Sequence, residues 1–598
     1  MTMTDTTSAQ IDVRVEGTPL NPMVAAKLIS AEVDTTVFVP SQFRLVFRAP
    51  STQVLEPGGL QLGVMVMLQV TTGGAPTPLM TGDITGVEVE YGPEGHLTIV
   101  TGLDRSHRLM RGTKTMAYPQ MSASDVVTQI VAEAGLMTGE VIPTSTQYEW
   151  VTQPNVSPWV FIQQLAALEN CVAYVDPMGL FQFGPMNKPE EGLPPVMSYA
   201  EPPQGTQLVL GKNLIRLRCN VTSSEQVPAV TVTGYNPKQA MPVVGLFPSA
   251  PSTSQSLDPG TLPPALAGEV GALPFFDASR PFDDQGAAEK RAESIAADIA
   301  GALAEMEGEC LGNPAILAGE VISLGMVGPP FDGQYVCTAA RHRFEPGNGG
   351  YSTWFTVGGM RDRSMLALAS GSGGVSDLTG NGRVPGVAIG IVTDNMDPES
   401  QGRVKVMFPW LSEAYVSAWA RTMQIGAGKA GGYGCLFIPE VGDEVLVGFD
   451  RGHVDSPYVI GNLYNGVSKP QPAPSIEGGV ANRRIMSRMR HMIEFDDGPD
   501  KLGITIVDGE QTLTIKLDSQ QQTITINSEG QINIQAQGAL SLKATADIGI
   551  ESEGNVSIKG TGGVSVQSPA SLSMEGAGGV KVEGSNVSVS APQISLGA

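Results

Sequence analysis

The sequence predicts a mainly β protein that ends in a needle, a triple-stranded intertwined β-helix built by a homotrimer. The first observation behind this fold class is an eight-residue repeat that begins at Ile524, in which two apolar residues flank one polar residue. The second is a small residue that follows each apolar pair four positions later. The third is an upstream alternation of apolar and polar residues between Gly and Pro turns, which is typical of antiparallel strands.

The repeat continues through eight octads without an insertion or a deletion. The apolar pairs, which we predict to form the needle core, are Ile524 and Ile526, Ile532 and Ile534, Leu540 and Leu542, Ile548 and Ile550, Val556 and Ile558, Val564 and Val566, Leu572 and Met574, and Val580 and Val582. The small residues are Gly530, Gly538, Ala546, Gly554, Gly562, Ala570 and Gly578. A fixed short period of this kind is typical of a β-helix, in which only the stacking of repeats buries a core.

The shortness of the period indicates that three chains share one core. Only alternate residues of a strand face the same side, so each octad supplies two aliphatic side chains. A chain that closed its own coil would need several strands per turn, and its period would be about twenty residues. Three chains that each form one face of a triangular prism need one strand and one corner per layer. Residues 520–598 are therefore predicted to be one third of a needle.

A disordered Gly- and Ser-rich tail is the alternative interpretation, but it predicts few aliphatic residues without a fixed phase. The final pairs of the segment are Val587 with Val589 and Ile594 with Leu596, and Ala598 follows closely. Exposed strand edges at such an end are normally covered in natural proteins. We therefore predict that Ile594, Leu596 and Ala598 bind a separate tip protein.

The composition excludes several classes of function. The 598 residues carry 60 acidic and 36 basic side chains, a net charge of −24, so no basic surface for nucleic acid is expected. The five cysteines never have CxxC spacing, which indicates reduced core residues rather than disulfides or zinc ligands. The first residues lack a signal-peptide pattern, and no apolar run reaches the roughly 18 residues of a membrane span. We expect synthesis in the cytoplasm without a signal peptide.

The first third of the chain reads as strands followed by helices. Alternation over residues 10–120 predicts a first β-barrel or sandwich. Two helices are then expected, over residues 122–137, where Ser122 or Ser124 can cap, and over residues 157–169. Residues 171–184 are predicted to form a hairpin.

A second β module of similar size follows. An Ala-rich helix is expected within it over residues 284–307, because two Asp residues open the segment and favour a helix N-terminus. Residues 236–283 are rich in Pro, Ser and Gly and are predicted to be a long surface loop. Five short strands with tight Gly turns over residues 386–466 are typical of a small Greek-key barrel of the OB type.

These observations divide the chain into seven parts. The predicted domains are a first β-barrel (1–120), a module of helices and a hairpin (121–204), a second β-barrel (205–363) with the loop 236–283, a linker (364–385), an OB-fold domain (386–466), a neck (467–519) and the needle (520–598).

The compact unit resembles the OB domain of valine-glycine-repeat (VgrG) spikes and of phage tail spikes. The motifs that carry the resemblance are Gly402-Arg403-Val404-Lys405-Val406, Phe408-Pro409-Trp410, Trp419-Ala420-Arg421, Pro439-Glu440-Val441-Gly442-Asp443-Glu444-Val445 and Gly461-Asn462-Leu463-Tyr464-Asn465. Its motif positions are Arg403, Trp410, Trp419, Pro439, Gly442, Asp443 and Tyr464. Upstream, Gln153-Pro154-Asn155 with Trp159 looks like the helix entry of the phage hub family.

The resemblance implies a trimeric hub–spike of a contractile injection system. Such a protein closes the sixfold tail tube, adapts it to threefold symmetry and punctures the target envelope. Two barrels per chain would turn three chains into a pseudo-sixfold ring. The implied partners are two further copies of the chain, the inner tail-tube protein, baseplate components and a PAAR-type tip protein at the needle end. The target membrane is contacted only on puncture, and the chain becomes part of the assembled particle.

Other motifs carry little weight. Residues 426–431 match GxGxxG, but no long helix follows them, so a flexible loop is the better interpretation. The five histidines are far apart and lack the spacing of a zinc site. We therefore predict no enzyme activity, no catalytic, cofactor-binding or metal-binding residues, and no cofactor.

Three alternatives stay open at this point. The first is a tail-associated cell-wall hydrolase with a site in residues 236–283, and the second is a type VI secretion spike that carries effectors. The third, a receptor-binding fibre, predicts a C-terminal knob that the sequence does not show. The residues do not distinguish a phage baseplate, a type VI apparatus and a free or membrane-anchored tail-like particle.

Overall fold

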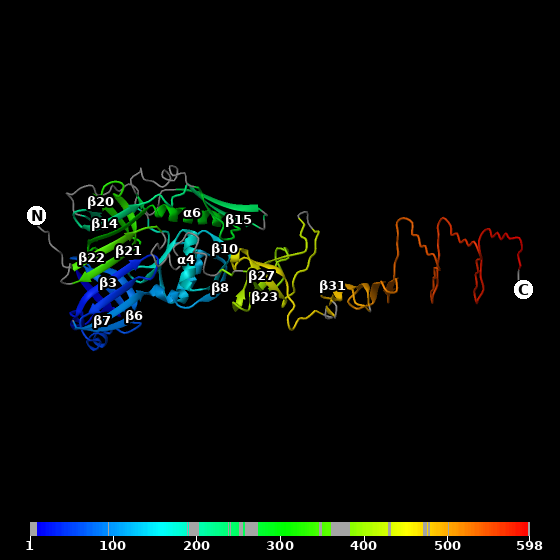
Figure 1. Ribbon diagram of the computed structural model, residues 1–598, viewed down its shortest axis with the longest axis horizontal. Coiled ribbons are helices and arrows are strands. Elements are labelled where there is room, and N and C mark those ends of the chain that lie inside the picture. Colours follow the sequence, from blue (N-terminus) through cyan, green and yellow to red (C-terminus); the bar gives the residue numbers. More distant parts are fainter. Residues whose placement is uncertain are drawn as a thin grey trace. The chain divides into compact units, whose positions relative to one another are not determined.

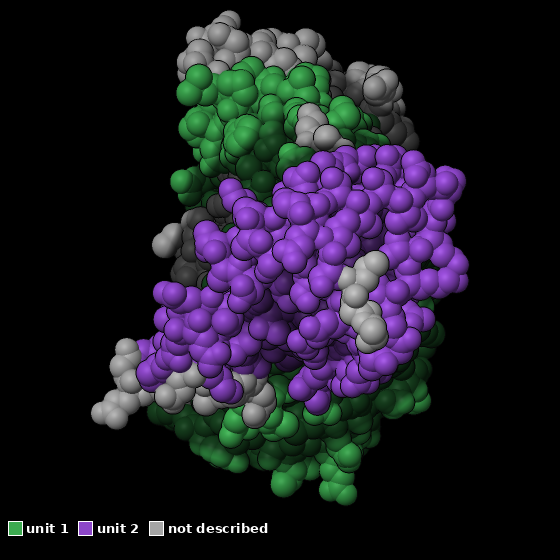
Figure 2. Space-filling model, turned by 90° about the vertical axis from the view of Figure 1, so that its right-hand side faces the viewer, with its two compact units in different colours: residues 1–469 green, residues 470–598 purple. Residues whose placement is uncertain are grey.

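The computed structural model describes residues 9–93, 95–187, 189, 203–236, 239, 241–249, 255–256, 273–345, 350–359, 383–384, 386–428, 432–470, 475–476, 479–499 and 501–595. Most of the predicted linker 364–385 and part of the GxGxxG match lie outside these residues. The chain divides into two compact units, residues 1–469 and residues 470–598, which Figure 2 colours separately. Each unit is described by itself below.

The largest element of unit 1 is a 14-stranded sheet (Figure 1). Its strands are β1 (Gln10–Val15), β2 (Thr18–Pro19), β3 (Leu28–Thr36), β4 (Gln42–Phe47), β5 (Met65–Thr71), β6 (Thr77–Gly92), β7 (Gly95–Asp104), β13 (Gln207–Val209), β14 (Leu214–Val221), β17 (Gln255–Ser256), β19 (Ala304–Leu311), β20 (Val321–Gly325), β21 (Gly333–Glu345) and β22 (Gly350–Val357). Alternation forms these strands: in β4, for example, Phe43, Leu45 and Phe47 are buried.

The two predicted β modules share this sheet. Strands β1–β7 surround one apolar core, and β14 and β19–β22 border a second. Antiparallel pairing of β3 with β21 joins them, and the Thr35 hydroxyl donates to the Ala340 carbonyl at 3.2 Å across that pairing. The closure of each module into a barrel stays a prediction.

Short helices accompany the first module. They are α1 (Pro22–Ala25), α2 (Leu55–Gly58), and the 3-10 helices η1 (Ser51–Gln53) and η2 (Arg105–Met110). In η2, the Asp104 side chain caps the helix by accepting from the Ser106 backbone N–H at 2.8 Å.

The two helices predicted after residue 120 exist, with one shorter than expected. Helix α3 (Ala123–Glu133) starts at a capping box of Ser122 and Asp125. The predicted end at residue 137 is wrong. The chain leaves the helix at Gly135, which has φ +68°, and Met137 is already the first residue of β9 (Met137–Val141). Helix α4 (Pro158–Glu169) has the predicted length, with the Ser157 hydroxyl accepting from the Val160 N–H at 3.3 Å.

Two small sheets complete this part of unit 1. Strand β8 (Lys114–Ser122) pairs with β10 (Gln147–Val156), and β9 pairs with the hairpin of β11 (Val172–Val175) and β12 (Leu180–Gly184). The hairpin was predicted, and its turn is closed by the Gly179 N–H donating to the Asp176 carbonyl at 2.9 Å. The helices and these strands share one apolar core.

The third helix ends earlier than the sequence indicated. Helix α6 (Gln285–Gly301) begins at the predicted Asp284 cap, but residues 304–307 belong to β19, where Ala304 and Met306 face the second core. The predicted surface loop 236–283 contains three strands, β16 (Met241–Pro248), β17 and β18 (Phe275–Asp277). There β16 joins β15 (Ala229–Asn236) and β18 in a sheet that packs on α6. Helices α4 and α6 lie side by side (Figure 1).

The predicted OB unit is a six-stranded sheet with its own core. The strands are β23 (Val387–Asp394), β24 (Lys405–Phe408), β25 (Ser412–Val416), β26 (Arg421–Thr422), β27 (Glu444–Phe449) and β28 (Pro457–Asn462), with the 3-10 helix η5 (Asp450–Gly452) before β28. Buried Val406, Phe408, Val445 and Val447 alternate with outward residues, as the period-2 pattern predicts.

Unit 2 contains a hairpin, a meander and a long irregular segment. The hairpin pairs β29 (Ser475–Ile476) with β30 (Gly479–Val480). The meander is an antiparallel sheet of β31 (Asn482–Met486), β32 (Met492–Asp496), β33 (Gly503–Val507), β34 (Leu513–Asp518) and β35 (Thr523–Ser528). Residues 529–595 contain no helix or strand in the single chain, and Figure 1 shows them as a trace with repeated bends. Within the described ranges, no helix has the length and apolarity to cross a membrane.

Candidate functional site: the OB module, the meander and the octad segment

The OB motif residue Arg403 holds a loop in place. Its guanidinium donates to both oxygens of Asp397, at 2.7 and 3.1 Å, and both side chains are under a tenth exposed. The Asp397 carboxylate also accepts from the backbone N–H groups of Glu399, Gln401 and Arg403 itself. The hydrogen bonds from Arg403 hold the pKa of Asp397 well below its ordinary value of 3.8. The motif arginine therefore has a structural partner that the sequence did not identify.

The two motif tryptophans serve packing within the OB module. The Trp410 indole donates to the Ile389 carbonyl at 3.1 Å, and its ring lies 5.9 Å from that of Phe408. The Trp419 ring lies 5.0 Å from the Lys405 ammonium group, a cation–π distance. The same ammonium group lies 5.9 Å from the ring of Trp150 on β10, so it joins the OB module to the helical part of unit 1.

The remaining motif residues shape the turn before β27. Gly442 has φ +93°, which favours glycine, and its N–H donates to the Val392 carbonyl at 2.8 Å. The Asp443 carboxylate accepts from the Glu440 N–H at 3.0 Å and from the Asn462 amide at 2.8 Å. Pro439 is buried beside this turn, whereas Tyr464 is 74% exposed. The motif residues thus stabilise the fold of the OB module, and among the described residues they do not lie together in one site.

The meander of unit 2 has one aliphatic face. Strand register places the apolar residues in two rows across the sheet, which are Ile485, Ile493, Ile506, Ile515 and Ile526, and Phe495, Ile504, Leu517 and Ile524, with Arg483 at the end of the second row. The opposite face is mixed, with the ion pair of Arg484 and Glu494 at 2.6 Å beside Met486, Met492 and Val507. Although Phe495 and Ile506 lie on internal strands, they are 43% and 41% exposed. The described residues therefore leave the aliphatic face uncovered.

The octad segment is exposed along its whole described length. Every predicted core residue from Ile532 to Val582 is at least 53% exposed, and the second member of each pair is more exposed than the first. Ile524 and Ile526, the first predicted pair, lie on β35 at the edge of the meander. At the predicted tip, Ile594 is 53% exposed, whereas Leu596 and Ala598 lie outside the described residues. A single chain therefore brings none of these pairs into a core.

Comparison with known families gives a match in the OB module. The family described as type VI secretion system/phage-baseplate injector OB domain matches residues 388–464. The type VI secretion system spike proteins VgrG1c and VgrG1a of Pseudomonas aeruginosa are 30% identical over 168 residues and 35% identical over 104 residues. The OB module therefore belongs to the injector OB domain family of type VI secretion systems and phage baseplates, and over this part the chain is similar to VgrG spike proteins.

The similarity to these VgrG proteins covers only part of each chain. The VgrG1c match covers 25% of this chain and 22% of the relative, and the VgrG1a match covers 16% of each. The chain therefore spans less than a quarter of the length of these curated relatives. A second family, described as Alg8 N-terminal domain, matches residues 61–345, which lie in unit 1 ahead of the OB module.

Solved structures of low identity also match. One is the E. coli c3393 protein, titled as a type VI secretion component with structural similarity to the T4 tail proteins gp27 and gp5. It is 14% identical, has a TM-score of 0.45, and the match covers 75% of this chain and 99% of that one. Another is the lidded PdpA-VgrG complex of Francisella, with 8% identity, a TM-score of 0.48, and coverage of 88% of this chain and 81% of that one.

The main feature that the sequence analysis did not predict is the aliphatic face of the meander. Its signal was present in the sequence, because Ile485, Ile493, Phe495, Ile504 and Ile506 alternate with polar residues before the first octad. The octad repeat begins only at residue 524. The alternation in residues 485–506 comes before it and was therefore not recognised as part of an apolar face.

Proposed function

We propose that this chain is the trimeric hub–spike of a contractile injection system. Three chains form the needle over residues 520–598, and the OB domains and hub modules follow it towards the tail tube. The spike closes the sixfold tube, adapts it to threefold symmetry and punctures the target envelope. Its work is mechanical and uses no catalytic residue or cofactor of its own.

The observation that carries this proposal is the exposure of the aliphatic repeat in the single chain. Burying an aliphatic side chain stabilises a protein by about 1.5–3 kcal/mol. A lone chain forgoes this stabilisation in every octad, because each pair from Ile532 to Val582 is more than half exposed. Three chains wound around one axis would bury all of these pairs. They would also cover the aliphatic faces of the three meanders.

The hub supports the symmetry-adaptor part of the proposal. Each chain has two β modules that share one sheet through the β3–β21 pairing. Three chains therefore supply six modules, which can match a sixfold ring of inner tail-tube protein. The baseplate components would then contact the outer surface of the hub.

The needle end supports a partner of its own. With one octad per layer and about 4.8 Å between layers, the shaft from Ile524 to Leu596 is about 45 Å long. Its last layer would present three strand edges and an aliphatic triangle. We propose that one PAAR-type tip protein covers this end of each trimer.

The experiment that tests this function is light scattering of the purified full-length chain. We expect a mass of three times 62.6 kDa that does not change on dilution. A stable folded monomer would overturn the proposal. The hydrolase alternative is tested with the same sample, since clearing of purified peptidoglycan that is lost when residues 236–283 are deleted would replace a mechanical role with an enzymatic one.

The names of the curated relatives favour one second candidate, a type VI secretion spike that carries effectors. This candidate has the same proposed trimeric structure and differs from the first in the injection system to which the protein belongs. Neighbouring reading frames that encode type VI membrane-complex proteins would favour it, and reading frames for phage tail or free-particle components would favour the first candidate.

A further inference from the structure

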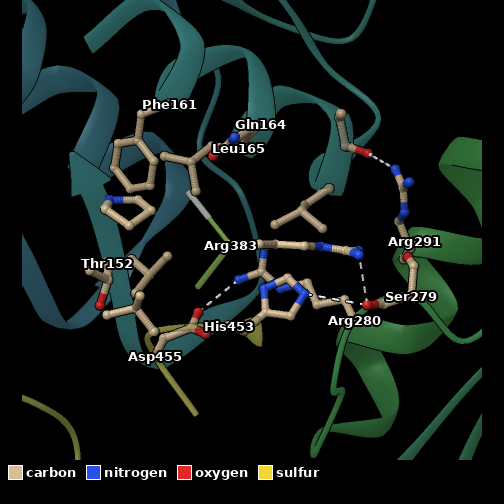
Figure 3. Close-up of a pocket in the computed structure, with 15 residues that line it drawn as sticks. Thr152, Phe161, Gln164, Leu165, Ser279, Arg280, Arg291, Arg383, His453 and Asp455 are labelled. Carbon is tan, nitrogen blue, oxygen red and sulfur yellow. Dashed lines mark hydrogen bonds and ion pairs between the residues drawn. The ribbon is translucent and has the colours of Figure 1, made fainter. Parts of the chain in front are cut away.

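A small pocket lies inside unit 1, where the helical part of the hub meets the OB module. Its walls come from β10, α4 and α6, from the segment between β18 and α6, from Arg383, and from residues 453–455 after η5 (Figure 3). The cavity has a volume of about 60 Å³ and is open at one end. A water-sized group needs roughly 10–15 Å³ of such space, so the cavity holds about four to six non-hydrogen atoms.

One wall of this junction pocket is apolar. Val151, Phe161, Leu165, Leu168 and Val454 line it, and each is less than a tenth exposed. Figure 3 shows Phe161 and Leu165 of α4 on the same side of the cavity. Val151, Phe161 and Leu165 belong to the core around α3 and α4, and Leu168 and Val454 belong to neighbouring cores, so the wall exists before any ligand arrives.

The other wall is cationic, which is unusual for this chain. The cationic groups are Arg280, Arg291 and Arg383; His453 lies beside them, and Asp455 is the single carboxylate in the lining. The whole chain has 60 acidic and only 36 basic residues, so the pocket reverses the overall charge balance. A local excess of positive charge in a concave, partly dry site attracts anions.

Contacts within the protein hold the cationic groups in position. Arg280 pairs with Asp455 at 3.0 Å, whereas Arg291 pairs with Asp277 at 3.7 Å and donates to the Ala167 carbonyl at 2.9 Å, so the charge excess of the wall rests on Arg383. Among the described residues, Arg383 donates one hydrogen bond, to the Ser279 carbonyl at 3.2 Å, and Nε2 of His453 lies 3.3 Å from the same oxygen. A guanidinium group has five N–H donors, so most of the donor capacity of Arg383 is available to a ligand.

The protonation of His453 reflects the same positive surroundings. Burial lowers the pKa of His453, and Arg280 and Arg383 lower it further, against the opposing effect of Asp455. Figure 3 shows the Arg383 side chain extended across the cavity close to the His453 ring. An anion beside these groups would offset the repulsion between them.

We propose that the junction pocket binds a short-chain carboxylate, with the carboxylate on Arg383 and Arg280 and the hydrocarbon part against Phe161 and Leu165. The planar fork of an arginine matches the two oxygens of a carboxylate. The apolar wall favours a carboxylate with an aliphatic stem over a fully hydrated anion such as phosphate. The bound group would touch both the helical part of the hub and the OB module and would hold them together.

The test is saturation-transfer NMR on the full-length protein with propionate as the probe. We expect saturation transfer to the methyl and methylene protons of propionate and none to propionamide, which has the same shape without the charge. Arg383→Gln should weaken propionate binding at least tenfold, because it removes the guanidinium group from an exposed position without disturbing the core. Arg218→Gln is the matched control, since Arg218 is an exposed arginine on β14, and it should bind propionate as the wild type does.

Three results would overturn the proposal: equal binding of propionate by the Arg383→Gln variant, equal binding of propionamide, or displacement of propionate by an equal concentration of inorganic phosphate. A glutamate whose amino and carboxyl termini are both blocked shows whether the carboxylate comes from a free acid or from a protein side chain. If it competes with propionate, the site accepts an acidic side chain of a protein. If propionate binds and the blocked glutamate does not compete, the site takes a free acid, and both results support the pocket.

Discussion

The hydroxyl groups of Thr152 and Tyr415 lie 3.1 Å apart and are buried, although 263 residues separate them in the chain. Thr152 is on β10 and Tyr415 is on β25, so this hydrogen bond joins the helical part of the hub to the OB module inside unit 1. Burial raises the pKa of Tyr415 to about 12, which keeps the hydroxyl protonated and able to donate. The Lys405 ammonium group between Trp150 and Trp419 lies at the same junction.

Removing the Tyr415 hydroxyl should loosen this junction. Tyr415→Phe keeps the ring, which stacks on Phe408 at 6.0 Å, and leaves the buried Thr152 hydroxyl without its partner. We expect a loss of about 1–2 kcal/mol, measured as a lower urea midpoint for unit 1. Tyr458→Phe is the control, because Tyr458 is 37% exposed and should change the midpoint little. Equal midpoints for the Tyr415→Phe variant and the wild type would contradict a hydrogen bond at the junction.

The Asp397–Arg403 pair should make the OB module sensitive to strong acid. Because the folded pKa of Asp397 is depressed, the pair contributes stability above pH 3.8, and this contribution is lost as the pH falls below that value. Asp397→Asn should destabilise the OB module by about 3 kcal/mol at pH 7, since it leaves the Arg403 charge buried without its counter-ion.

Thermal unfolding of both proteins between pH 7 and pH 3 measures this effect. The difference between them should shrink as the pH falls. Glu399→Gln is the matched control, because Glu399 approaches the same guanidinium at 3.3 Å but is 40% exposed, and its effect should stay below about 1 kcal/mol. A difference that is constant with pH would contradict the assignment.

The buried histidine of the second module should give the hub a second pH dependence. Burial lowers the pKa of His342 from 6.5 to about 4, and its Nδ1 lies 2.8 Å from the Tyr351 hydroxyl. The unfolded chain binds this proton below pH 6.5 and the folded chain does not, so stability falls as the pH drops from 6.5 towards 4. The loss is about 3 kcal/mol for one group.

His342→Gln should therefore flatten the pH profile of the melting temperature in that range, whatever its effect at pH 7. The difference between the two profiles is the relevant measurement, because burial raises the pKa of Asp104 to about 6 and contributes with the opposite sign. His96→Gln, at an exposed position, should keep the wild-type profile. Parallel profiles for His342→Gln and the wild type would exclude the effect.

A charge on the inner side of the needle should prevent assembly, and the same charge on the outer side should not. Ile532→Asp would place three carboxylates around the proposed axis in one layer. We expect its light-scattering mass to fall to that of a monomer or of aggregates, because the buried charges would lie unpaired. Asn533→Asp introduces the same residue one position later, facing solvent, and should remain a trimer. A trimeric Ile532→Asp variant would show that the alternation is assigned to the wrong side.

The needle end should be needed for the tip protein and for nothing else. Deletion of residues 590–598 should leave the trimer intact and abolish co-purification of a PAAR-type tip protein. Ser588→Asp, at an outward position between Val587 and Val589, should bind the tip as the wild type does. Retention of the tip by the truncated chain would place its binding surface elsewhere.

Local signals in the sequence predicted much of the fold. The helix predicted over residues 157–169 is α4, and the predicted Asp284 cap begins α6. Helix α6 was predicted six residues too long, to residue 307 instead of Gly301, because Ala304 and Met306 suit either a helix or a strand and only the second core selects the strand. Strand β16 was missed since Pro242 and Pro248 flank its apolar residues and hide the alternation.

The junction pocket could not be predicted from local patterns at all. Phe161, Arg280, Arg383 and His453 come from four separate segments of the chain, and no spacing relates them. The octads differ from the pocket in this respect. Their period is visible in the sequence, but in the single chain their apolar side chains stay exposed.

The uncovered aliphatic face of the meander also affects how the protein assembles. If the proposed trimer forms, a chain whose unit 1 has folded still has Ile493, Ile506 and Ile515 in contact with water until two more chains arrive. Formation of the shaft is then a reaction between molecules, and its rate rises with protein concentration, whereas folding of the hub does not depend on concentration. A defective chain made alongside the normal one would enter most trimers and spoil them, so a single damaged gene copy would be dominant.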